Sequence, residues 1–159
     1  MAQNKAVEAV RANPGKTATA GARAAAMALA VPLVAKWEGK RNDPYLDIVG
    51  IATVCYGETN VAMRRYSDAE CSAMLRKSLT DSYAVPVIRC TPILADRPYQ
   101  LAAASSLAYN IGTTAYCRST VARRFNAGDF VGACNGFLSW SYAGGRQVQG
   151  LLNRRRDER

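Results

Sequence analysis

A nearly continuous apolar segment from Ala18 to Ala35 constrains this chain most, because its side chains have to be removed from water in some way. A helix that spans a membrane needs about 20 apolar residues. This segment is rich in Ala and is interrupted by Arg23 and Pro32. Basic residues precede it, as in the charged front of a secretion signal. Three interpretations stay open: a cleaved signal, a weak export anchor that is not cleaved, and an ordinary helix packed on the domain.

The segment divides the chain of 159 residues, which has the length of one domain, into three parts. Residues 1–17 are polar, basic and rich in Ala, and we expect them to form a tail. Residues 18–35 are the weakly hydrophobic segment, which we expect to serve as an export signal or anchor. Residues 36–159 are long enough for one globular domain, in which the chemistry of the protein has to be found.

The composition limits the chemistry that this domain can perform. Twenty-one Lys and Arg residues against twelve Asp and Glu residues give a formal charge of +9, which attracts nucleic acid, anionic membranes or anionic cell-wall polymers. The chain has no histidine, so Ser-His-Asp and Cys-His catalysis are excluded, together with every metal site that contains His. Acid–base work is therefore left to carboxylates, Tyr, Lys or Cys.

A small hairpin is predicted directly after the apolar segment. The helical pattern stops after Trp37-Glu38-Gly39, and Asp43-Pro44 is interpreted as a turn because Pro disfavours helix at the residue before it. Residues 45–56 form short β-branched runs that are broken at Gly50, which is typical of two strands and a turn.

Helices are predicted for most of the remaining chain. Ser67 and Glu70 form a capping-box pattern, which predicts a helix to about residue 83. Further helices are predicted from Pro98 to Gly112, after the caps Ser119 and Asp129, and over residues 147–156. The expected fold class is therefore α+β and mainly α-helical, with a small hairpin next to the first helix.

Residues 38–59 carry the most specific pattern of the chain and read EGKRNDPYLDIVGIATVCYGET. Within them, Glu38, Asp47 and Thr53 have the spacing Glu-x8-Asp-x5-Thr. Four later segments follow in a fixed order: Tyr109-Asn110-Ile111-Gly112, Cys117-Arg118-Ser119-Thr120, residues 140–145 and residues 150–155. In this order the segments resemble the phage lysozyme (muramidase) family of endolysins, over about residues 37–156.

The resemblance implies a lysozyme-like fold and assigns roles to three residues. Hydrolysis of a glycosidic bond needs a protonated acid at the leaving oxygen and a second group that deals with the oxocarbenium-like centre. Glu38 is implied as the general acid, Asp47 as the group that orients water or stabilises charge, and Thr53 as a hydrogen-bond partner of that water. The residues expected to line the cleft and contact the glycan are Tyr45, Tyr109 and Asn110, the last two having the end of a core helix as their alternative interpretation.

Other side chains near this pattern have plainer interpretations. Arg154 and Arg155 are candidate partners of Glu38 across the cleft, although solvated charges on a helix are the favoured interpretation. Trp140 and Tyr142 are expected in the core rather than against a sugar ring.

The five cysteines contain no Cys-x-x-Cys pair, which argues against a zinc or redox motif. They favour disulfides formed in an oxidising compartment, although spacing alone does not determine the pairing. The resemblance implies that Cys55 pairs with Cys71 and Cys90 with Cys117. Cys134 is left over, and a buried free thiol is an ordinary interpretation for it.

The predicted function is that of a phage endolysin, which hydrolyses the β-1,4 bond between N-acetylmuramic acid and N-acetylglucosamine in bacterial peptidoglycan and so lyses the host cell. No cofactor or metal is expected, the protein is expected to be a monomer, and the basic residues contain no recognition element for nucleic acid. Residues 18–35 resemble the signal-arrest-release anchors of some endolysins. This implies synthesis in the host cytoplasm, transient association with the inner membrane, and export to the periplasm of a Gram-negative host.

Two alternative functions stay open. A lytic transglycosylase cuts the same bond without water, although Asp47 and Thr53 on the muramidase spacing argue against it. A cationic membrane-perturbing protein would use its net charge and its apolar segment on anionic lipid. Product analysis distinguishes the first alternative, and a Glu38 variant that still kills cells would reveal the second.

Overall fold

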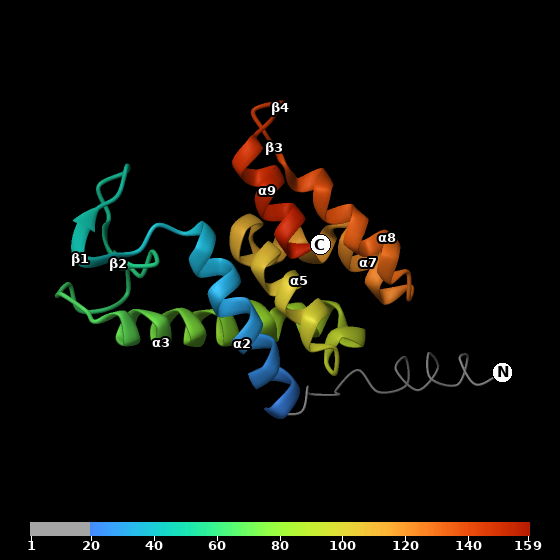
Figure 1. The fold of residues 1–159 in the computed structure, drawn as a ribbon, viewed down its shortest axis with the longest axis horizontal. Helices are drawn as coiled ribbons and strands as arrows, with labels where there is room; N and C mark the ends of the chain where they lie inside the picture. The colour runs from blue at the N-terminus through green and yellow to red at the C-terminus, as the bar shows by residue number, and fades with distance from the viewer. Residues whose placement is uncertain (1–19) are drawn as a thin grey trace.

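The computed structural model describes residues 20–159, so the expected tail of residues 1–17 lies outside the described part of the chain. Figure 1 shows two lobes: a small one that contains strands β1 (Arg41–Leu46) and β2 (Ala52–Cys55), and a larger one made mainly of helices. We call them the hairpin lobe and the helical lobe. Helix α3 (Asp68–Ser78) begins beneath the hairpin and runs toward the helical lobe.

Helix α2 (Ala20–Trp37) contains most of the apolar segment and packs on helix α5 (Pro98–Ile111). Its buried residues are Ala26, Met27, Ala30 and Val34, which the helical repeat places on one face. The opposite face is also apolar but exposed, with Leu29 at 39% exposure. The helix continues through Pro32, and within residues 20–159 no helix is long and apolar enough to cross a membrane. In this structure, α2 packs on the helical lobe through its buried face.

The hairpin differs from its prediction at one point. Asp43 and Pro44 do not form the predicted turn but lie inside β1. The strand accommodates Pro44 because its pairing with β2 shifts between Arg41 and Tyr45, and an irregular stretch does not need the amide donor that proline lacks. The chain turns instead at Gly50, whose φ of 82° suits glycine.

The helices confirm most of the predicted boundaries. Ser67 and Glu70 form the capping box of α3, Ser119 caps α7 (Thr120–Asn126) and Asp129 caps α8 (Phe130–Gly136). The helix predicted to end near residue 83 continues instead as a π-helical stretch, η1 (Leu79–Ala84), and then as α4 (Val85–Cys90). The other elements are η2 (Pro92–Leu94), α6 (Thr113–Arg118), η3 (Phe137–Trp140), β3 (Tyr142–Ala143), β4 (Arg146–Gln147) and α9 (Gln149–Glu158).

A second hairpin, β3–β4, has no counterpart in the sequence prediction. Its two strands are two residues long each, too short for an alternating pattern to be visible in the sequence. Gly144 and Gly145 form its turn, and both have positive φ.

Each lobe has its own core and its own disulfide. The core of the hairpin lobe consists of Val54, Cys55, Tyr66 and Cys71, while Tyr56 packs against both cores. Disulfides join Cys55 to Cys71, with Cα atoms 5.1 Å apart, and Cys90 to Cys117, with Cα atoms 5.7 Å apart. These are the pairs that the family resemblance implies, and Cys134 is a free, partly buried thiol.

We expect the disulfide of the helical lobe to contribute substantially to stability. Cys90 and Cys117 are 27 residues apart, so their bond removes considerable freedom from the unfolded chain. Replacing both with Ala should lower the free energy of unfolding by about 2–4 kcal/mol. Urea unfolding followed by tryptophan fluorescence measures this loss. The matched control is Cys134→Ala, which should cost less than about 1 kcal/mol. A double variant as stable as the control would contradict the prediction.

Candidate active site

Glu38 directly follows helix α2, and its amide still donates a helical hydrogen bond to the Val34 carbonyl at 3.1 Å. The packing of α2 therefore determines where the carboxyl group lies. Arg154 Nη1 donates to Glu38 Oε1 at 2.7 Å, across 116 residues of sequence. The Glu38 side chain is 28% exposed and that of Arg154 is 5% exposed. Glu38 is thus held at the surface by a buried cation.

The favoured interpretation of Arg154 and Arg155 as solvated helix charges is wrong. Both residues are buried, and the Arg155 side chain is completely inaccessible to solvent. Their burial is possible because Glu158, one turn further along α9, is also buried and faces both guanidinium groups.

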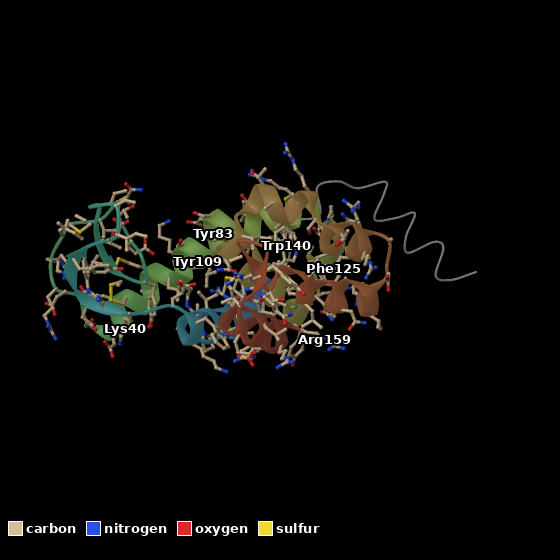
Figure 2. The ribbon with its side chains drawn as sticks, turned by 90° about the horizontal axis from the view of Figure 1, so that it is seen from above. Lys40, Tyr83, Tyr109, Phe125, Trp140 and Arg159 are labelled. Carbon is tan, nitrogen blue, oxygen red and sulfur yellow. A yellow bond between two sulfur atoms is a disulfide. The ribbon has the colours of Figure 1, made fainter. Side chains whose placement is uncertain are left out.

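Two tyrosines lie beside each other where the lobes meet, as Figure 2 shows. The rings of Tyr83, from η1, and Tyr109, from α5, have their centroids 5.0 Å apart. Tyr109 Oη donates to the Tyr56 carbonyl at 2.8 Å and so ties α5 to the end of the hairpin. Burial raises the pKa of Tyr109, and the Glu38 carboxylate raises it further. Tyr109 therefore stays a neutral hydrogen-bond donor close to Glu38.

Glu58 adds a second carboxyl group to this region. Burial raises the pKa of Glu58, and its charge contributes to the raised pKa values of both Tyr83 and Tyr109. Neither Glu58 nor Tyr83 was predicted from the sequence as a residue of this region. Glu58 lies within residues 38–59, which carry the family resemblance, but it is outside the spacing of Glu38, Asp47 and Thr53. No pattern in the sequence around Tyr83 indicates that it lies near these residues.

Asp47 lies at the turn of the hairpin, where its side chain organises the loop. Its Oδ1 atom accepts hydrogen bonds from the amides of Val49 at 2.9 Å and Ile51 at 2.8 Å. Thr53 is buried in β2, and its hydroxyl donates to the Ile51 carbonyl at 2.9 Å. Both predicted site residues therefore shape the same turn.

The other predicted contact residues occupy different surroundings. Tyr45 pairs with Thr53 across the hairpin and lies under the Arg41 guanidinium, 4.6 Å from the ring centroid. Asn110 is exposed at the end of α5. Trp140 packs partly buried on the helical core, as predicted, whereas the prediction that Tyr142 is a core residue is wrong because it is 58% exposed in the β3–β4 hairpin.

The structure thus brings Glu38 together with Arg154 and Tyr109, and it groups Asp47, Thr53 and Tyr45 on the hairpin. Within residues 20–159, no hydrogen bond or ion pair joins Glu38 to Asp47 or Thr53. The described part of the chain also contains no group of three or more Cys, Asp or Glu side chains that could hold a metal ion. The chemical groups available between the lobes are carboxyl, phenol and guanidinium.

A mainly helical α+β fold with a carboxyl group at the end of a helix, followed by a two-stranded hairpin, is the arrangement of a lysozyme-type glycoside hydrolase. The sequence profile of the family described as Phage lysozyme matches residues 35–158. The chain is 42% identical over 118 residues to the SAR-endolysin of Escherichia phage Mu, which corresponds to 72% of this chain and 67% of that protein.

Solved structures agree with this assignment. A mutant P22 lysozyme has a TM-score of 0.69 and 26% identity, over 89% of this chain and 94% of the other. The muramidase domain of SpmX from Asticcacaulis excentricus has a TM-score of 0.66 and 26% identity, over 81% of this chain and 90% of that domain. The chain belongs to the phage lysozyme family, and it is therefore a glycoside hydrolase of the endolysin type.

We expect the hydrogen bond between the lobes to be measurable in the variant Tyr109→Phe. The substitution keeps the ring but leaves the Tyr56 carbonyl without its donor, so the free energy of unfolding should fall by about 1 kcal/mol. The control is Tyr99→Phe, because Tyr99 is 72% exposed and its hydroxyl makes no hydrogen bond within residues 20–159. Equal unfolding midpoints in urea for the two variants would count against the role of this bond.

Proposed function

We propose that Glu38 is the general acid with which this chain hydrolyses the β-1,4 bond between N-acetylmuramic acid and N-acetylglucosamine in peptidoglycan. The observation that carries the proposal is the way its carboxyl group is held. One oxygen, Oε1, is fixed by Arg154, while Oε2 has no hydrogen bond within residues 20–159 and the side chain is 28% exposed. An acid needs this combination of one fixed oxygen and one oxygen that is free to deliver a proton to the leaving group.

Asp47 and Thr53 are proposed to handle the attacking water from the hairpin side. The two amides that bind Asp47 Oδ1 orient this carboxylate, and Oδ2 is free of hydrogen bonds within the described residues. Because Thr53 donates to the Ile51 carbonyl, its oxygen lone pairs remain available to accept from a water molecule. We place the glycan between the lobes, with Tyr45, Tyr109 and Asn110 as contacts.

Arg154 places a positive charge 2.7 Å from Glu38 Oε1, whereas a general acid has to carry a proton at the start of the reaction. After the proton has moved to the leaving oxygen, however, Arg154 is placed to stabilise the carboxylate that results. The site therefore stabilises the carboxylate that remains after proton transfer. Before the transfer, another group has to offset the positive charge of Arg154.

We further propose that the protein is made in the host cytoplasm, associates transiently with the inner membrane through residues 18–35, and acts in the periplasm as a monomer. The support is the exposed apolar face of α2, the two disulfides, and the relatives that carry the name SAR-endolysin. Glu38 directly follows α2, so a membrane-held segment would also displace the acid. Release and packing of the segment would then switch activity on.

The first test of this function is Glu38→Gln, which keeps the shape of the side chain and removes its proton. We expect release of fragments from purified peptidoglycan to fall by at least about a thousandfold, because both general acid catalysis and the carboxylate product are lost. Mass spectrometry of the fragments is the measurement. Asp96→Asn is the control. Asp96 is exposed and lies just before the N-terminal end of α5, away from Tyr109, so this substitution should leave activity unchanged.

The products separate this proposal from its alternatives. Reducing ends released only by proteins with Glu38 intact support a hydrolytic muramidase. Anhydro-sugar ends would move the assignment to a lytic transglycosylase. Lysis of cells by Glu38→Gln at the wild-type rate would instead make membrane disruption the cause of lysis.

A pair of variants separates the charge of Asp47 from its part in the loop. Asp47→Asn keeps an oxygen that accepts from the Val49 and Ile51 amides, whereas Asp47→Ala removes it. If the charge acts on the reaction, both variants should lose about a hundredfold in kcat while only Asp47→Ala also loosens the hairpin. Activity assays and amide hydrogen exchange of the loop are the measurements. Wild-type activity of Asp47→Asn would restrict Asp47 to a structural role.

A further inference from the structure

A buried cluster of charged and polar side chains lies directly behind Glu38, and Arg154 is the member of it that already has a role in the proposed mechanism. It consists of Ser106 from α5 and of Arg154, Arg155 and Glu158 from α9. Glu158 Oε1 accepts from Ser106 Oγ at 2.6 Å, from Arg154 Nε at 3.2 Å and from Arg155 Nη2 at 3.0 Å, and Oε2 lies 2.8 Å from Arg155 Nε. We call these four residues the α9 cluster.

The α9 cluster is poorly explained by stability alone. The side chains of Arg155 and Glu158 are 0% exposed, and removing charges from water is costly even when they are paired. Arg154 Nη2 and Arg155 Nη1 are buried without a hydrogen-bond partner among the described residues. Apolar side chains could fill the same space at lower cost, so the buried charges call for another explanation.

Burial raises the pKa of Glu158 above its ordinary value, and the charge of Arg155, the hydroxyl of Ser106 and the charge of Arg154 offset part of that rise. The geometry supports the carboxylate form, because Ser106 and both guanidinium groups donate to its Oε1 atom. Because arginine does not lose its proton in proteins, a protonated Glu158 would leave two buried guanidinium charges to be balanced by Glu38 alone.

Arg154 is shared between two carboxylates. Its Nη1 atom binds Glu38, and its Nε atom binds Glu158. A guanidinium that is already partly neutralised by Glu158 attracts the Glu38 carboxylate less, and the negative charge of Glu158 directly favours a proton on Glu38. This is the moderation of Arg154 that a general acid requires.

We propose that Glu158, which is fixed by Ser106, is a positioning residue for the reaction. It orients Arg154 toward Glu38, and it offsets the positive charge of Arg154 so that Glu38 can be protonated before each turnover. The inference rests on the proposed role of Glu38. In the reaction, the bond between the anomeric carbon and the leaving oxygen breaks as the Glu38 proton moves to that oxygen. The oxygen of the attacking water bonds to the anomeric carbon, and one proton of the water passes to solvent. Glu38 then takes one proton back from solvent before the next cycle. Glu158 favours this return.

Other charged and titratable groups lie in the elements around Glu38, but they differ from Glu158. Tyr109 on α5 and Tyr83 in η1 are phenols whose pKa values are raised by burial and by the charge of Glu38, and Glu58 follows β2. Lys36 on α2 is paired with Asp157 at 2.6 Å, and that pair is more exposed. Among residues 20–159, Arg154 donates to two carboxylates, those of Glu38 and Glu158.

The decisive variant is Glu158→Gln, which keeps the size of the side chain and removes its charge. The positive charges of Arg154 and Arg155 would then act on Glu38 without this counter-charge. We therefore expect the carboxylate form of Glu38 to be stabilised relative to its protonated form. The alkaline limb of kcat/KM against pH, measured on soluble glycan strands, should move to lower pH by about one unit. Asp157→Asn is the matched control: it removes the same charge at the adjacent residue, from an exposed pair, and its limb should stay within about 0.2 unit.

The second variant is Ser106→Ala, which keeps every charge but removes the 2.6 Å hydrogen bond to Glu158. We expect kcat to fall about fivefold with an unchanged KM, because Arg154 and Glu38 are less well oriented. It also carries the test if circular dichroism shows that Glu158→Gln does not fold.

Three results would overturn the inference: an alkaline limb that does not move in folded Glu158→Gln, an equal movement in Asp157→Asn, or a wild-type kcat in Ser106→Ala. Failure of the proposed function is distinguishable, because it appears as activity in Glu38→Gln whatever the α9 cluster variants do.

Discussion

The packing of α2 against α5 is the interaction on which the site depends. Both helices are rich in Ala at their contact, and small side chains let two helices approach closely. This contact positions two chemical groups at once, because Glu38 directly follows α2 and Tyr109 lies in the last turn of α5. The geometry between acid and phenol is therefore a property of the apolar core rather than of a loop.

The helical lobe and the hairpin lobe supply different kinds of chemistry because they hold their carboxyl groups differently. In the helical lobe, Glu38 is held by a guanidinium group that is itself buried. In the hairpin, Asp47 is held by neutral backbone amides at Oδ1, and its Oδ2 atom has no hydrogen bond among the described residues. Two carboxyl groups with unlike surroundings suit unlike roles, which is what hydrolysis of a glycosidic bond demands.

Much of the fold could be predicted because its signals are local. The capping box at Ser67 and the caps at Ser119 and Asp129 depend on residues within a few positions of each other. The turn predicted at Asp43-Pro44 failed because proline is equally compatible with an irregular strand, and only the partner strand decides between the two. Local sequence therefore indicates where elements begin more reliably than how they pair.

In the candidate site, too, local patterns could be recognised from the sequence and distant contacts could not. The spacing of Glu38, Asp47 and Thr53 could be recognised because it lies within one segment, although the roles of these residues stay predictions. The burial of Arg154 was not readable, because its partners come from α2 and from the end of its own helix. Its ion pair with Glu38 spans 116 residues, and whether a charged residue is buried depends on such distant partners.

The apolar segment contributes both to the core and to the candidate site. A helix with one apolar face has a single place in a folded domain, but α2 is apolar on its outer face as well. Its place in the domain is fixed by the buried face that packs on α5, and its C-terminal end is fixed with it. In the packed form that end carries Glu38 to Arg154. The ion pair is therefore a consequence of the packed arrangement, to which it adds a contact between the end of α2 and α9.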